Sequence, residues 1–291
     1  MRGKMLKLGF IGAGTVGTAL AVLLCSKGYQ VVGVSSRSRD SAENLAKAVD
    51  GCRVLKNNQE VADTADFVFI TTPDGAIAGV ASQVKWRNRQ SAVHCSGADS
   101  TDILEPARES GALVGSFHPL QTFAGVKQAI ENIPGSTFAV EAGEPLRSTL
   151  KDMATALSCH AIELQASDKV AYHAAAVFAC NYLVTLVKLS TDLWQTFSIP
   201  PDQATRALLP LISGTLHNID TIGIPQCLTG PIARGDTGTI KKHLEALREK
   251  APALLSPYKE LGLQTVPIAL AKGRINRQQA SALEAILKQA D

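Results

Sequence analysis

Residues 8–17 read LGFIGAGTVG, and this stretch decides the fold. The apolar run before Gly12 is typical of a buried strand, and the glycines after it follow the spacing GxGxxG directly before a helical pattern. In that setting Gly12 allows a tight turn, Gly14 lets the backbone approach a pyrophosphate, and Gly17 lets the helix pack closely on the strand. The helix N-terminus then faces the negative charge of the ligand.

This pattern predicts a dinucleotide site, and a merely glycine-rich turn is the alternative. The residues expected to hold the dinucleotide here are Gly12, Ala13, Gly14, Thr15, Val16 and Gly17.

The second predicted strand, 30–35, ends in the sequence SSRSR rather than in an acidic residue. A site for NAD commonly has an acidic residue there to accept from the ribose 2′-hydroxyl, whereas a site for NADP needs donors for a 2′-phosphate. Ser35 ends the strand, Ser36 can donate its hydroxyl to the 2′-phosphate, and Arg37 can form a charge-assisted pair with it. Ser38 and Arg39 can add further donors. We expect NADP as the cofactor, and a solvated basic turn is the alternative.

Up to about residue 165, short runs rich in β-forming residues alternate with helical patterns. The run DFVFITT, 66–72, is continuously apolar, as expected for a strand of a parallel sheet that is covered on both faces. This alternation predicts an α/β fold with a Rossmann-like doubly wound sheet. The expected strands are 6–11, 30–35, 53–55, 67–71, 92–95, 114–117, 137–140 and 161–164, and the expected helices between them are 16–26, 41–49, 75–83 and 101–109.

From Ser167 onward no further strand is expected, because the apolar period becomes helical. Ser167 can cap a helix that runs to about Phe197, before Pro200 and Pro201. Further helices are expected at 201–218, 239–250, 252–261 and 276–289, with kinks or breaks at the prolines 210, 257 and 267. The organisation is thus an NADP-binding domain, 1–165, and an all-α domain, 166–291.

The most apolar window, 170–187, is long enough to suggest a membrane span. It contains His173 and Asn181, so a buried core helix is the better interpretation.

Composition indicates an ordinary soluble globular protein. Hydrophobic residues make up 45% of the chain, charged residues 19%, and the formal net charge is +3 without a long basic run, which argues against a nucleic-acid surface. The six cysteines lie far apart without a CxxC pair, which indicates neither a disulfide framework nor a metal site and favours a reducing cytoplasm.

Substrate should bind beyond the carboxyl ends of the strands, next to the nicotinamide. The segments TTPD, 71–74, and HCSGA, 94–98, should border the cofactor through Thr72, Pro73, Ser96 and Gly97. His118, just beyond the strand in SFHPLQTF, can bind or protonate a substrate oxygen; the alternative is a loop histidine with a structural hydrogen bond. His94 lies inside a buried strand, so a structural role is expected there.

The predicted long helix carries Lys169, His173, Val177 and Asn181 at steps of four, which places them along one stripe. Lys169 is the expected proton donor, His173 would orient it, and Asn181 is a candidate for substrate binding. The alternative is a solvated first-turn lysine with two satisfied core polar groups.

A loop of sequence LTGPIARGDTGT, 228–239, interrupts two predicted helices. Its Arg234 can offer a guanidinium to a substrate carboxylate. The equally weighted alternative is a helix connection in which Asp236 caps the next helix.

Several of these motifs together resemble one family. The segments GAGTVG, HCSGA, FHPLQTF, DKVAYHAAAVFACNY and LTGPIARGD resemble predicted NADP oxidoreductases that join a Rossmann-like domain to the domain of unknown function 2520. The resemblance covers nearly the whole chain. It implies a helical C-terminal domain like that of 6-phosphogluconate dehydrogenase, in a wider group with ketopantoate reductase, pyrroline-carboxylate reductase and β-hydroxyacid dehydrogenases, which commonly dimerise through this domain.

In the hydroxyacid and ketopantoate enzymes, a lysine early in the interdomain helix performs acid catalysis, followed by asparagines at steps of four. Lys169 matches that lysine, whereas His173 stands where the first asparagine would be.

We therefore expect an NADP-dependent oxidoreductase that transfers a hydride between nicotinamide and a small oxo, hydroxy or imino acid, and that forms a homodimer in the cytoplasm. The alternatives are a non-catalytic sensor of the NADP redox state and a deazaflavin-linked NADP oxidoreductase.

Overall fold

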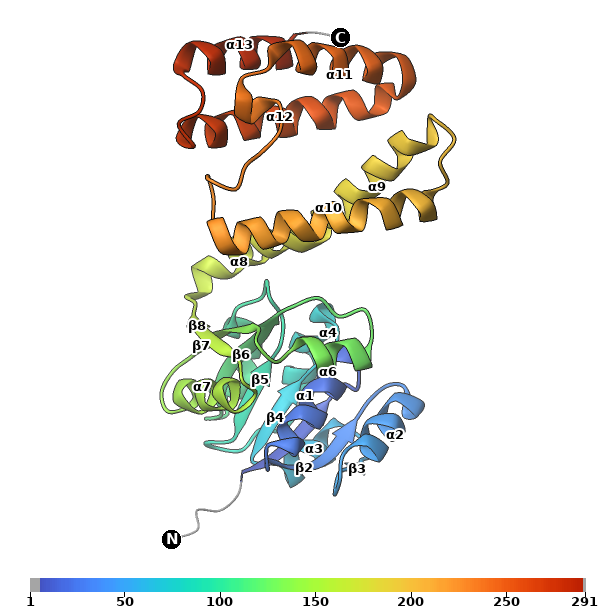
Figure 1. The fold of residues 1–291 in the computed structure, drawn as a ribbon. Helices are drawn as coiled ribbons and strands as arrows, with labels where there is room; N and C mark the ends of the chain where they lie inside the picture. Colours follow the sequence, from blue (N-terminus) through green and yellow to red (C-terminus); the bar gives the residue numbers. More distant parts are fainter. Residues whose placement is uncertain (1–5, 290–291) are drawn as a thin grey trace. The chain divides into compact units, whose positions relative to one another are not determined.

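The computed structural model describes residues 6–289 (Figure 1). The chain divides into two compact units, Met1–Cys180 and Asn181–Asp291. The predicted helical segment beginning near Ser167 therefore contributes its first turns to the unit that contains the sheet. Each unit has a hydrophobic core of its own.

The first unit is built on one sheet of eight strands in the order β3-β2-β1-β4-β5-β6-β7-β8. All eight predicted strands are confirmed. Neighbouring strands are parallel except β6 and β7, which are antiparallel, so the sheet is not parallel throughout as we expected. The strands are β1 (Lys7–Ile11), β2 (Gln30–Ser35), β3 (Arg53–Val54), β4 (Phe67–Ile70), β5 (Ser91–His94), β6 (Leu113–Leu120), β7 (Thr137–Ala142) and β8 (His160–Glu163).

Side-chain packing accounts for the antiparallel pair. In its register Phe117 of β6 lies opposite Val140 of β7. The ring of Phe117 also stacks on that of Phe138, with 4.0 Å between ring centroids. Both rings are buried in the core beneath the sheet, so this pairing extends the apolar face by a further strand.

Helices cover both faces of the sheet (Figure 1). In β4, Phe67 and Phe69 enter one core while Val68 and Ile70 enter the other, which explains the continuous apolar run in the sequence. One face carries α1 (Thr15–Ser26), α2 (Arg39–Ala48), α6 (Val126–Asn132) and α7 (Leu146–Ala156), and the other carries α3 (Asn58–Thr64), α4 (Asp74–Gln83) and α5 (Glu105–Glu109).

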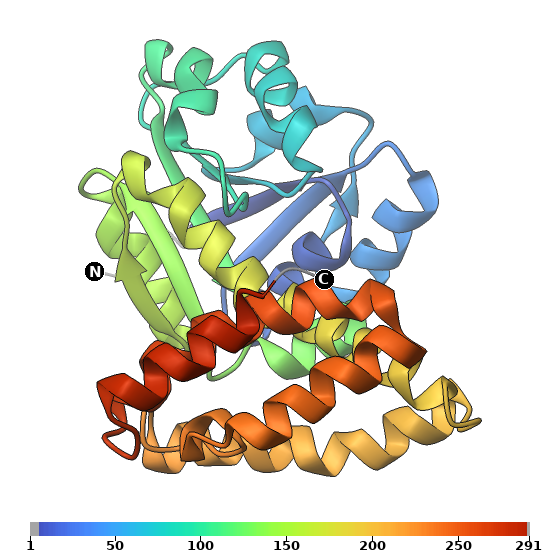
Figure 2. The same cartoon turned by 90° about the horizontal axis from the view of Figure 1, so that it is seen from above.

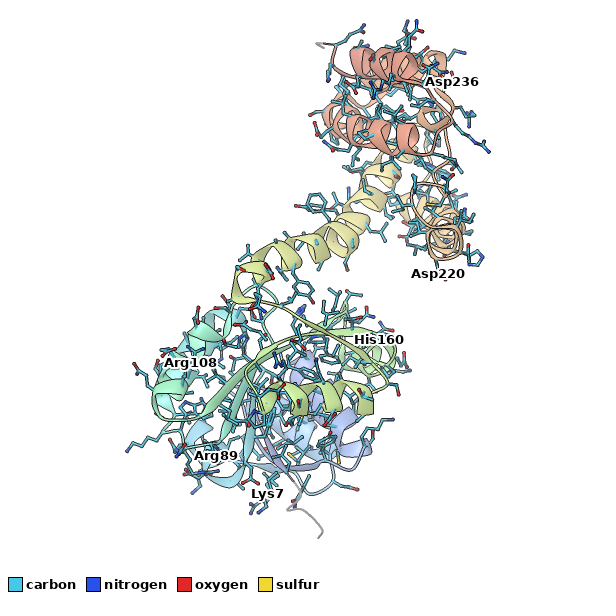
Figure 3. All side chains as sticks on the ribbon, turned by 90° about the vertical axis from the view of Figure 1, so that its left-hand side faces the viewer. Lys7, Arg89, Arg108, His160, Asp220 and Asp236 are labelled. Atoms are coloured by element: carbon cyan, nitrogen blue, oxygen red, sulfur yellow. The ribbon has the colours of Figure 1, made fainter. Side chains whose placement is uncertain are left out.

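Three of these helices, α3, α6 and α7, were not predicted. The predicted helix 101–109 is a 3-10 turn, η1 (Thr101–Leu104), followed by α5. Polar side chains such as Arg108 and His160, labelled in Figure 3, lie at the surface of the first unit.

The predicted long helix is present, but it is not uniform. It comprises the short 3-10 turn η2 (Ala166–Asp168), α8 (Lys169–Ala176), a π-type segment η3 (Val177–Asn181) and α9 (Tyr182–Gln195). The π-type segment has a wider turn than an α-helix, so residues four apart no longer lie on one line through it.

The expectation of a buried core helix at 170–187 is wrong for the single chain. None of the most apolar window of helix Ala166–Gln195 is buried, and the side chains of Val170 and Val184 are each 69% exposed. Among residues 6–289, this helix is the one whose length and composition would allow it to cross a membrane, which is weak support for such a role.

The second unit is helical, as predicted. Its helices are α9, α10 (Pro201–Ile222), α11 (Thr237–Lys250), α12 (Leu255–Ala271) and α13 (Arg277–Leu287), with short 3-10 turns η4 (Ile232–Arg234) and η5 (Pro252–Leu254). Helices α11, α12 and α13 enclose the core of this unit, and α12 and α13 lie side by side (Figure 2). Both α10 and α12 continue through Pro210 and Pro267, so these prolines do not break them.

Candidate functional site

A pocket of about 820 Å³ lies beyond the carboxyl ends of β1, β2 and β4. It is lined by the turn after β1 (residues 12–14), by residues 35–38 at the end of β2, and by residues 71–73 after β4. In the sheet order, β1 lies between β2 and β4, so the chain changes direction across the sheet at this point. Ligands of open α/β sheets bind at such a crevice.

The glycines have the three local properties that their spacing predicts. Gly12 has a φ of +107°, and a Cβ there would lie 2.7 Å from the carbonyl of Thr71. Gly14 has nothing within 4 Å of its missing Cβ, so its backbone stays open toward the pocket. A Cβ on Gly17 would overlap Thr71 Oγ1 and lie 2.7 Å from the Gly12 carbonyl, because α1 packs closely on the strand ends.

In the serine- and arginine-rich turn after β2, some polar side chains form hydrogen bonds within the protein and others are open to the pocket. Ser35 donates its hydroxyl to Asn58 Oδ1 at 2.8 Å, and Ser38 caps α2 by accepting from the backbone N–H of Ser41. Arg39 pairs with Glu43 at 2.9 Å. Arg37, in contrast, is exposed and lines the pocket with Ser36.

A second polar group of the pocket comes from the segment after β4. Thr72 lines the pocket, and its hydroxyl oxygen is buried without a hydrogen-bond partner within residues 6–289. A buried hydroxyl normally has a partner, so Thr72 fits a site that is completed by a ligand. With Gly14 open and Arg37 at the rim, these residues fit a phosphorylated dinucleotide.

The pocket contains only part of the predicted cofactor set. It is lined by Gly12, Ala13, Gly14, Ser35, Ser36, Arg37, Thr72 and Pro73, whereas Thr15, Val16, Gly17, Ser96 and Gly97 do not line it. Thr15 to Gly17 form the first turn of α1. Ser96 and Gly97 belong to a separate polar cluster.

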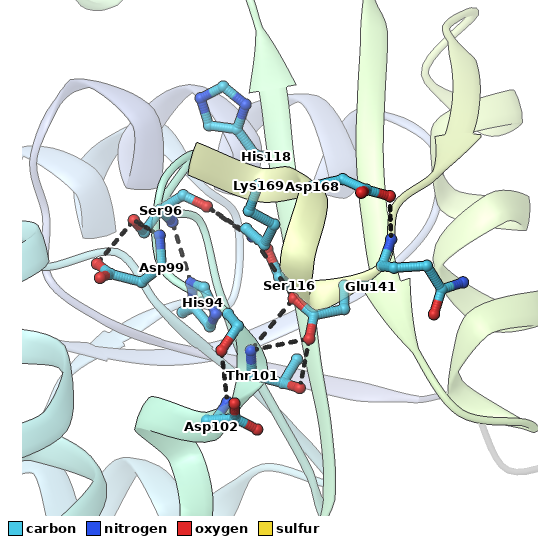
Figure 4. Close-up of polar contacts among 12 residues, drawn as sticks. His94, Ser96, Asp99, Thr101, Asp102, Ser116, His118, Glu141, Asp168 and Lys169 are labelled. Carbon is cyan, nitrogen blue, oxygen red and sulfur yellow. Dashed lines mark hydrogen bonds and ion pairs between the residues drawn. The ribbon is translucent and has the colours of Figure 1, made fainter. Parts of the chain in front are cut away.

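That polar cluster surrounds Lys169, whose side chain is 1% exposed (Figure 4). Its ammonium donates to the Ser96 carbonyl at 3.1 Å and to Ser116 Oγ, and it lies 3.9 Å from Glu141 Oε2. Glu141 in turn accepts from the backbone N–H of Thr101 at 3.1 Å and from its hydroxyl at 2.8 Å. A residue of α8 is thereby connected to the loop after β5 and to β6 and β7.

Ser96 extends this network toward the surface. Its hydroxyl lies 3.0 Å from Asp74 Oδ2 and 2.9 Å from Asp99 Oδ2, and it accepts from the backbone N–H of Asp99. A hydroxyl has a single hydrogen, so it can donate to only one of the two carboxylates at a time. The backbone N–H of Ser96 donates to Nδ1 of His94 at 3.1 Å, which supports the predicted structural role of His94.

Two imidazoles converge on Gly97. A Cβ at this glycine would lie 2.8 Å from His118 Nε2 and 2.7 Å from His173 Cδ2. The two imidazole ring centroids are 6.2 Å apart. On its other side, His118 shares a hydrogen bond of 2.8 Å between Nδ1 and the hydroxyl of Tyr172. Gly97 thus leaves the space that both rings need.

The electrostatic surroundings favour uncharged rings at His118 and His94. Burial, reinforced by the positive charge of Lys169 and by His173, lowers the pKa of His118 to about 4. Burial and Lys169 lower the pKa of His94 to about 3. Burial also lowers the pKa of Lys169, against the opposing effect of the Glu141 carboxylate, and burial raises the pKa of Tyr172 to about 12.

The remaining predicted site residues, Asn181 and Arg234, belong to the second unit. Asn181 ends the π-type segment. Arg234 ends η4 and is exposed, and Asp236 accepts from the N–H of Thr239 at 2.9 Å and caps α11 (Figure 3). The Asp-capped helix start weighed above is therefore present, and a substrate role for Arg234 stays a prediction.

Sequence reasoning missed Ser116, Glu141 and Tyr172. Each had a weak signal: Ser116 and Glu141 are polar residues in predicted apolar strands or at their ends, and Tyr172 lies three residues after Lys169, on the same helix face. Their contacts depend on strand pairing across the sheet, which a single sequence does not specify.

Comparison with known proteins places this geometry in a family. The model of the Rossmann-like domain matches residues 1–119, and the model of the domain of unknown function 2520 matches residues 136–265. Two solved structures share the fold over nearly the full chain. One is a Bacteroides fragilis protein provisionally named an NADP oxidoreductase, with 27% identity, a TM-score of 0.72, and coverage of 93% of this chain and 98% of that one. The other is a Thermotoga maritima protein with 28% identity, a TM-score of 0.73, and coverage of 90% and 99%.

A curated relative adds a named activity. The 2-(hydroxymethyl)glutarate dehydrogenase of Eubacterium barkeri is 26% identical over 140 residues, which cover 48% of this chain and 44% of that protein. The chain thus matches less than half the length of this relative. These similarities are to NAD(P)-dependent oxidoreductases in general. The two family matches show that the chain belongs to the family that joins a Rossmann-like domain to the domain of unknown function 2520.

Proposed function

We propose that the chain is an NADP-dependent oxidoreductase that acts on a small oxo, hydroxy or imino acid. The observation that carries the proposal lies within the first unit. A dinucleotide-type pocket occupies the ends of β1, β2 and β4, and the cluster of Lys169, His118 and His173 gathers beyond the neighbouring strands β5 and β6. A cofactor pocket next to a group of proton-carrying side chains suits hydride transfer coupled to proton transfer.

The choice of NADP rests on the turn after β2. Arg37 lines the pocket and is not engaged by Glu43, which pairs with Arg39 instead. No acidic residue among 35–38 is available to accept from a free 2′-hydroxyl. The provisional name of the Bacteroides fragilis protein, which includes NADP, agrees with this assignment.

Each residue of the cluster has a proposed role in the reaction. The bound cofactor supplies or accepts the hydride at its nicotinamide C4. His118 Nε2, which lies beside Gly97, would hydrogen-bond the substrate oxygen or nitrogen, and His173 lies beside the same glycine. Lys169 would supply the proton, and its positive charge would stabilise negative charge on the substrate. In the observed conformation Lys169 donates to Ser96 and Ser116 and its side chain is 1% exposed, so direct donation to a substrate requires movement of this buried side chain or of its neighbours.

A carboxylate on the substrate is the second part of the proposal. The relative from Eubacterium barkeri is named for a hydroxy-substituted dicarboxylate, which agrees with an acid as substrate. Asn181 and Arg234 of the second unit are the proposed substrate-binding groups, since a guanidinium pairs well with a carboxylate.

We also propose that the chain acts as a homodimer, which the resemblance implies, in the cytoplasm. The second unit exposes several large apolar side chains, among them Leu211 at 68% and Ile222 at 57% of α10. Apolar surface of this kind marks association sites. A dimer is expected in light scattering of the purified chain, and Leu211→Lys should shift the mass toward the monomer. A wild-type chain that stays monomeric at micromolar concentration would exclude the homodimer.

The proposed activity is tested in two steps. Calorimetry should first show that the purified chain binds NADPH more tightly than NADH. A screen of oxo acids, imino acids and aldehydes, followed by the absorbance of NADPH, should then identify a substrate class. Absence of NADPH binding would contradict the whole proposal. Binding without any turnover would favour a redox sensor over an enzyme.

A further inference from the structure

The hydroxyl of Tyr172 has a single hydrogen-bond partner within residues 6–289, Nδ1 of His118 at 2.8 Å. The two rings meet edge to face, with 5.6 Å between centroids and 89° between planes. Tyr172 lies on α8 and His118 on β6, so the contact connects a helix to the sheet. Both side chains are only half-buried, so this hydrogen bond lies at the border of the polar cluster.

The direction of this hydrogen bond determines what His118 offers to the substrate. A phenol has one hydrogen to donate, and a neutral imidazole has one N–H and one acceptor nitrogen. If Tyr172 donates to Nδ1, its hydroxyl hydrogen is satisfied and the ring carries its own hydrogen on Nε2. In the opposite arrangement, Nδ1–H would donate to the phenol oxygen, and the phenol hydrogen of the half-buried Tyr172 would be left to solvent, since no other described residue accepts it.

We propose that Tyr172 is a positioning residue that holds His118 in the Nε2–H tautomer, with that hydrogen available to the substrate. This inference rests on the proposed function, because it names the group that recognises the substrate oxygen or nitrogen. In Figure 4 the His118 ring points away from the hydrogen-bond network around Lys169. Nε2 lies beside Gly97, whose missing Cβ leaves room for the rings of His118 and His173.

The charged and titratable groups around His118 agree with a neutral ring. Lys169 and His173 of α8 both lower the pKa of His118 and so disfavour a positive charge on its ring. Tyr172 of the same helix stays protonated because burial raises its pKa to about 12. The loop after β5 contributes Gly97, and β7 places Ala139 opposite His118, so neither element adds a charge at the ring. A neutral imidazole with a fixed hydrogen serves as a directional donor.

The first test reads the tautomer directly and needs no substrate. Long-range proton–nitrogen spectra of the full chain with nitrogen-15 histidine, assigned with a His118→Gln variant, should show His118 as the Nε2–H form at pH 7. Tyr172→Phe keeps the aromatic ring and should convert the signal into a mixture of tautomers. Tyr29→Phe, at a tyrosine of the first unit remote from His118, is the matched control and should leave the signal unchanged. A wild-type signal of the Nδ1–H form, or an unchanged signal in Tyr172→Phe, would overturn the proposal.

The second test uses turnover. Tyr172→Phe should lower kcat by about 10- to 100-fold with little change in KM for NADPH, less than the roughly 10²- to 10⁴-fold worth of a full acid–base group. The acid limb of the pH profile should also move to higher pH, because the variant loses the hydrogen bond that favours the neutral ring. Unchanged kcat and an unchanged acid limb would refute the positioning role. If the wild type turns over nothing, the proposed function fails, while the tautomer measurement still decides the role of Tyr172.

Discussion

The two units of the chain treat polar and apolar groups in opposite ways. The first unit buries polar groups: the ammonium of Lys169 on α8 is 1% exposed, and the neutral imidazole of His94 at the end of β5 is fully buried. The second unit exposes apolar side chains, with Leu211 68% exposed on α10. Burial of an ammonium costs several kcal/mol unless partners compensate, and exposure of leucine forgoes its burial energy. Each arrangement is unfavourable for an isolated domain, and it agrees with the chemistry proposed for the first unit and the association proposed for the second.

The largest difference between the two units is expected in the effect of lysine substitutions on turnover. Lys169→Met removes the ammonium but keeps the length of the side chain, and it should lower turnover by about 10²- to 10⁴-fold. Lys188→Met removes an exposed lysine that pairs with Asp192 on α9, and turnover should hardly change. Steady-state rates of both variants measure the difference, and NADPH affinity serves as a control for folding. Equal rates in Lys169→Met and wild type would show that the buried ammonium is purely structural.

For Lys169, the sequence predicts part of the site but not all of it. Its identity as a candidate followed from its place on a helix beside His173. Its burial did not, because the three groups that satisfy it, Ser96, Ser116 and Glu141, are brought together only by strand pairing. The pocket around Gly12, in contrast, was predicted because all three glycine roles act within one strand-turn-helix unit.

The elements show the same division between local and long-range information. The buried strands follow from apolar runs, whereas α3 and α6, of seven residues each, span about two turns and leave little periodicity to detect. Helix α7 did carry a signal, since Leu146, Leu150 and Met153 repeat at helical spacing, and it was overlooked. The burial assigned to 170–187 was wrong because composition indicates an apolar surface but does not indicate what covers it.

The next largest effect concerns leucines of the second unit. Leu244 is 2% exposed in the core of α11, α12 and α13, so Leu244→Ala should lower the free energy of unfolding by about 2–5 kcal/mol. Leu211→Ala should act differently, because an interface residue affects stability through the concentration of the partner. Urea unfolding at two protein concentrations checks both. A loss for Leu211→Ala as large as that for Leu244→Ala and independent of concentration would mean that Leu211 is part of the core.

A smaller effect is expected for the cofactor phosphate. Arg37→Ala should weaken NADPH by about 1.5–3 kcal/mol, the value of a hydrogen bond to a charged group, or roughly 10- to 100-fold in Kd. NADH, which lacks the 2′-phosphate, should bind as before, because the pyrophosphate still rests on the turn at Gly14. Arg39→Ala is the matched control, since its guanidinium already pairs with Glu43. If calorimetry shows that Arg37→Ala loses equal affinity for NADPH and NADH, the turn is only a solvated basic segment.

The smallest effect tests the cost of the buried histidine cluster in the first unit. Folding lowers the pKa of His118 to about 4, whereas an unfolded histidine titrates near the ordinary value of about 6.5. Between these two pH values the unfolded chain binds more protons, so stability is complete above about pH 6.5 and declines as the pH falls toward 4. The slope for one group is at most about 1.4 kcal/mol per pH unit, and solvent screening at the half-buried His118 makes it smaller. His118→Gln should flatten the decline in urea midpoints between pH 6.5 and 4.5, and an unchanged slope would show that His118 is not held neutral by its surroundings.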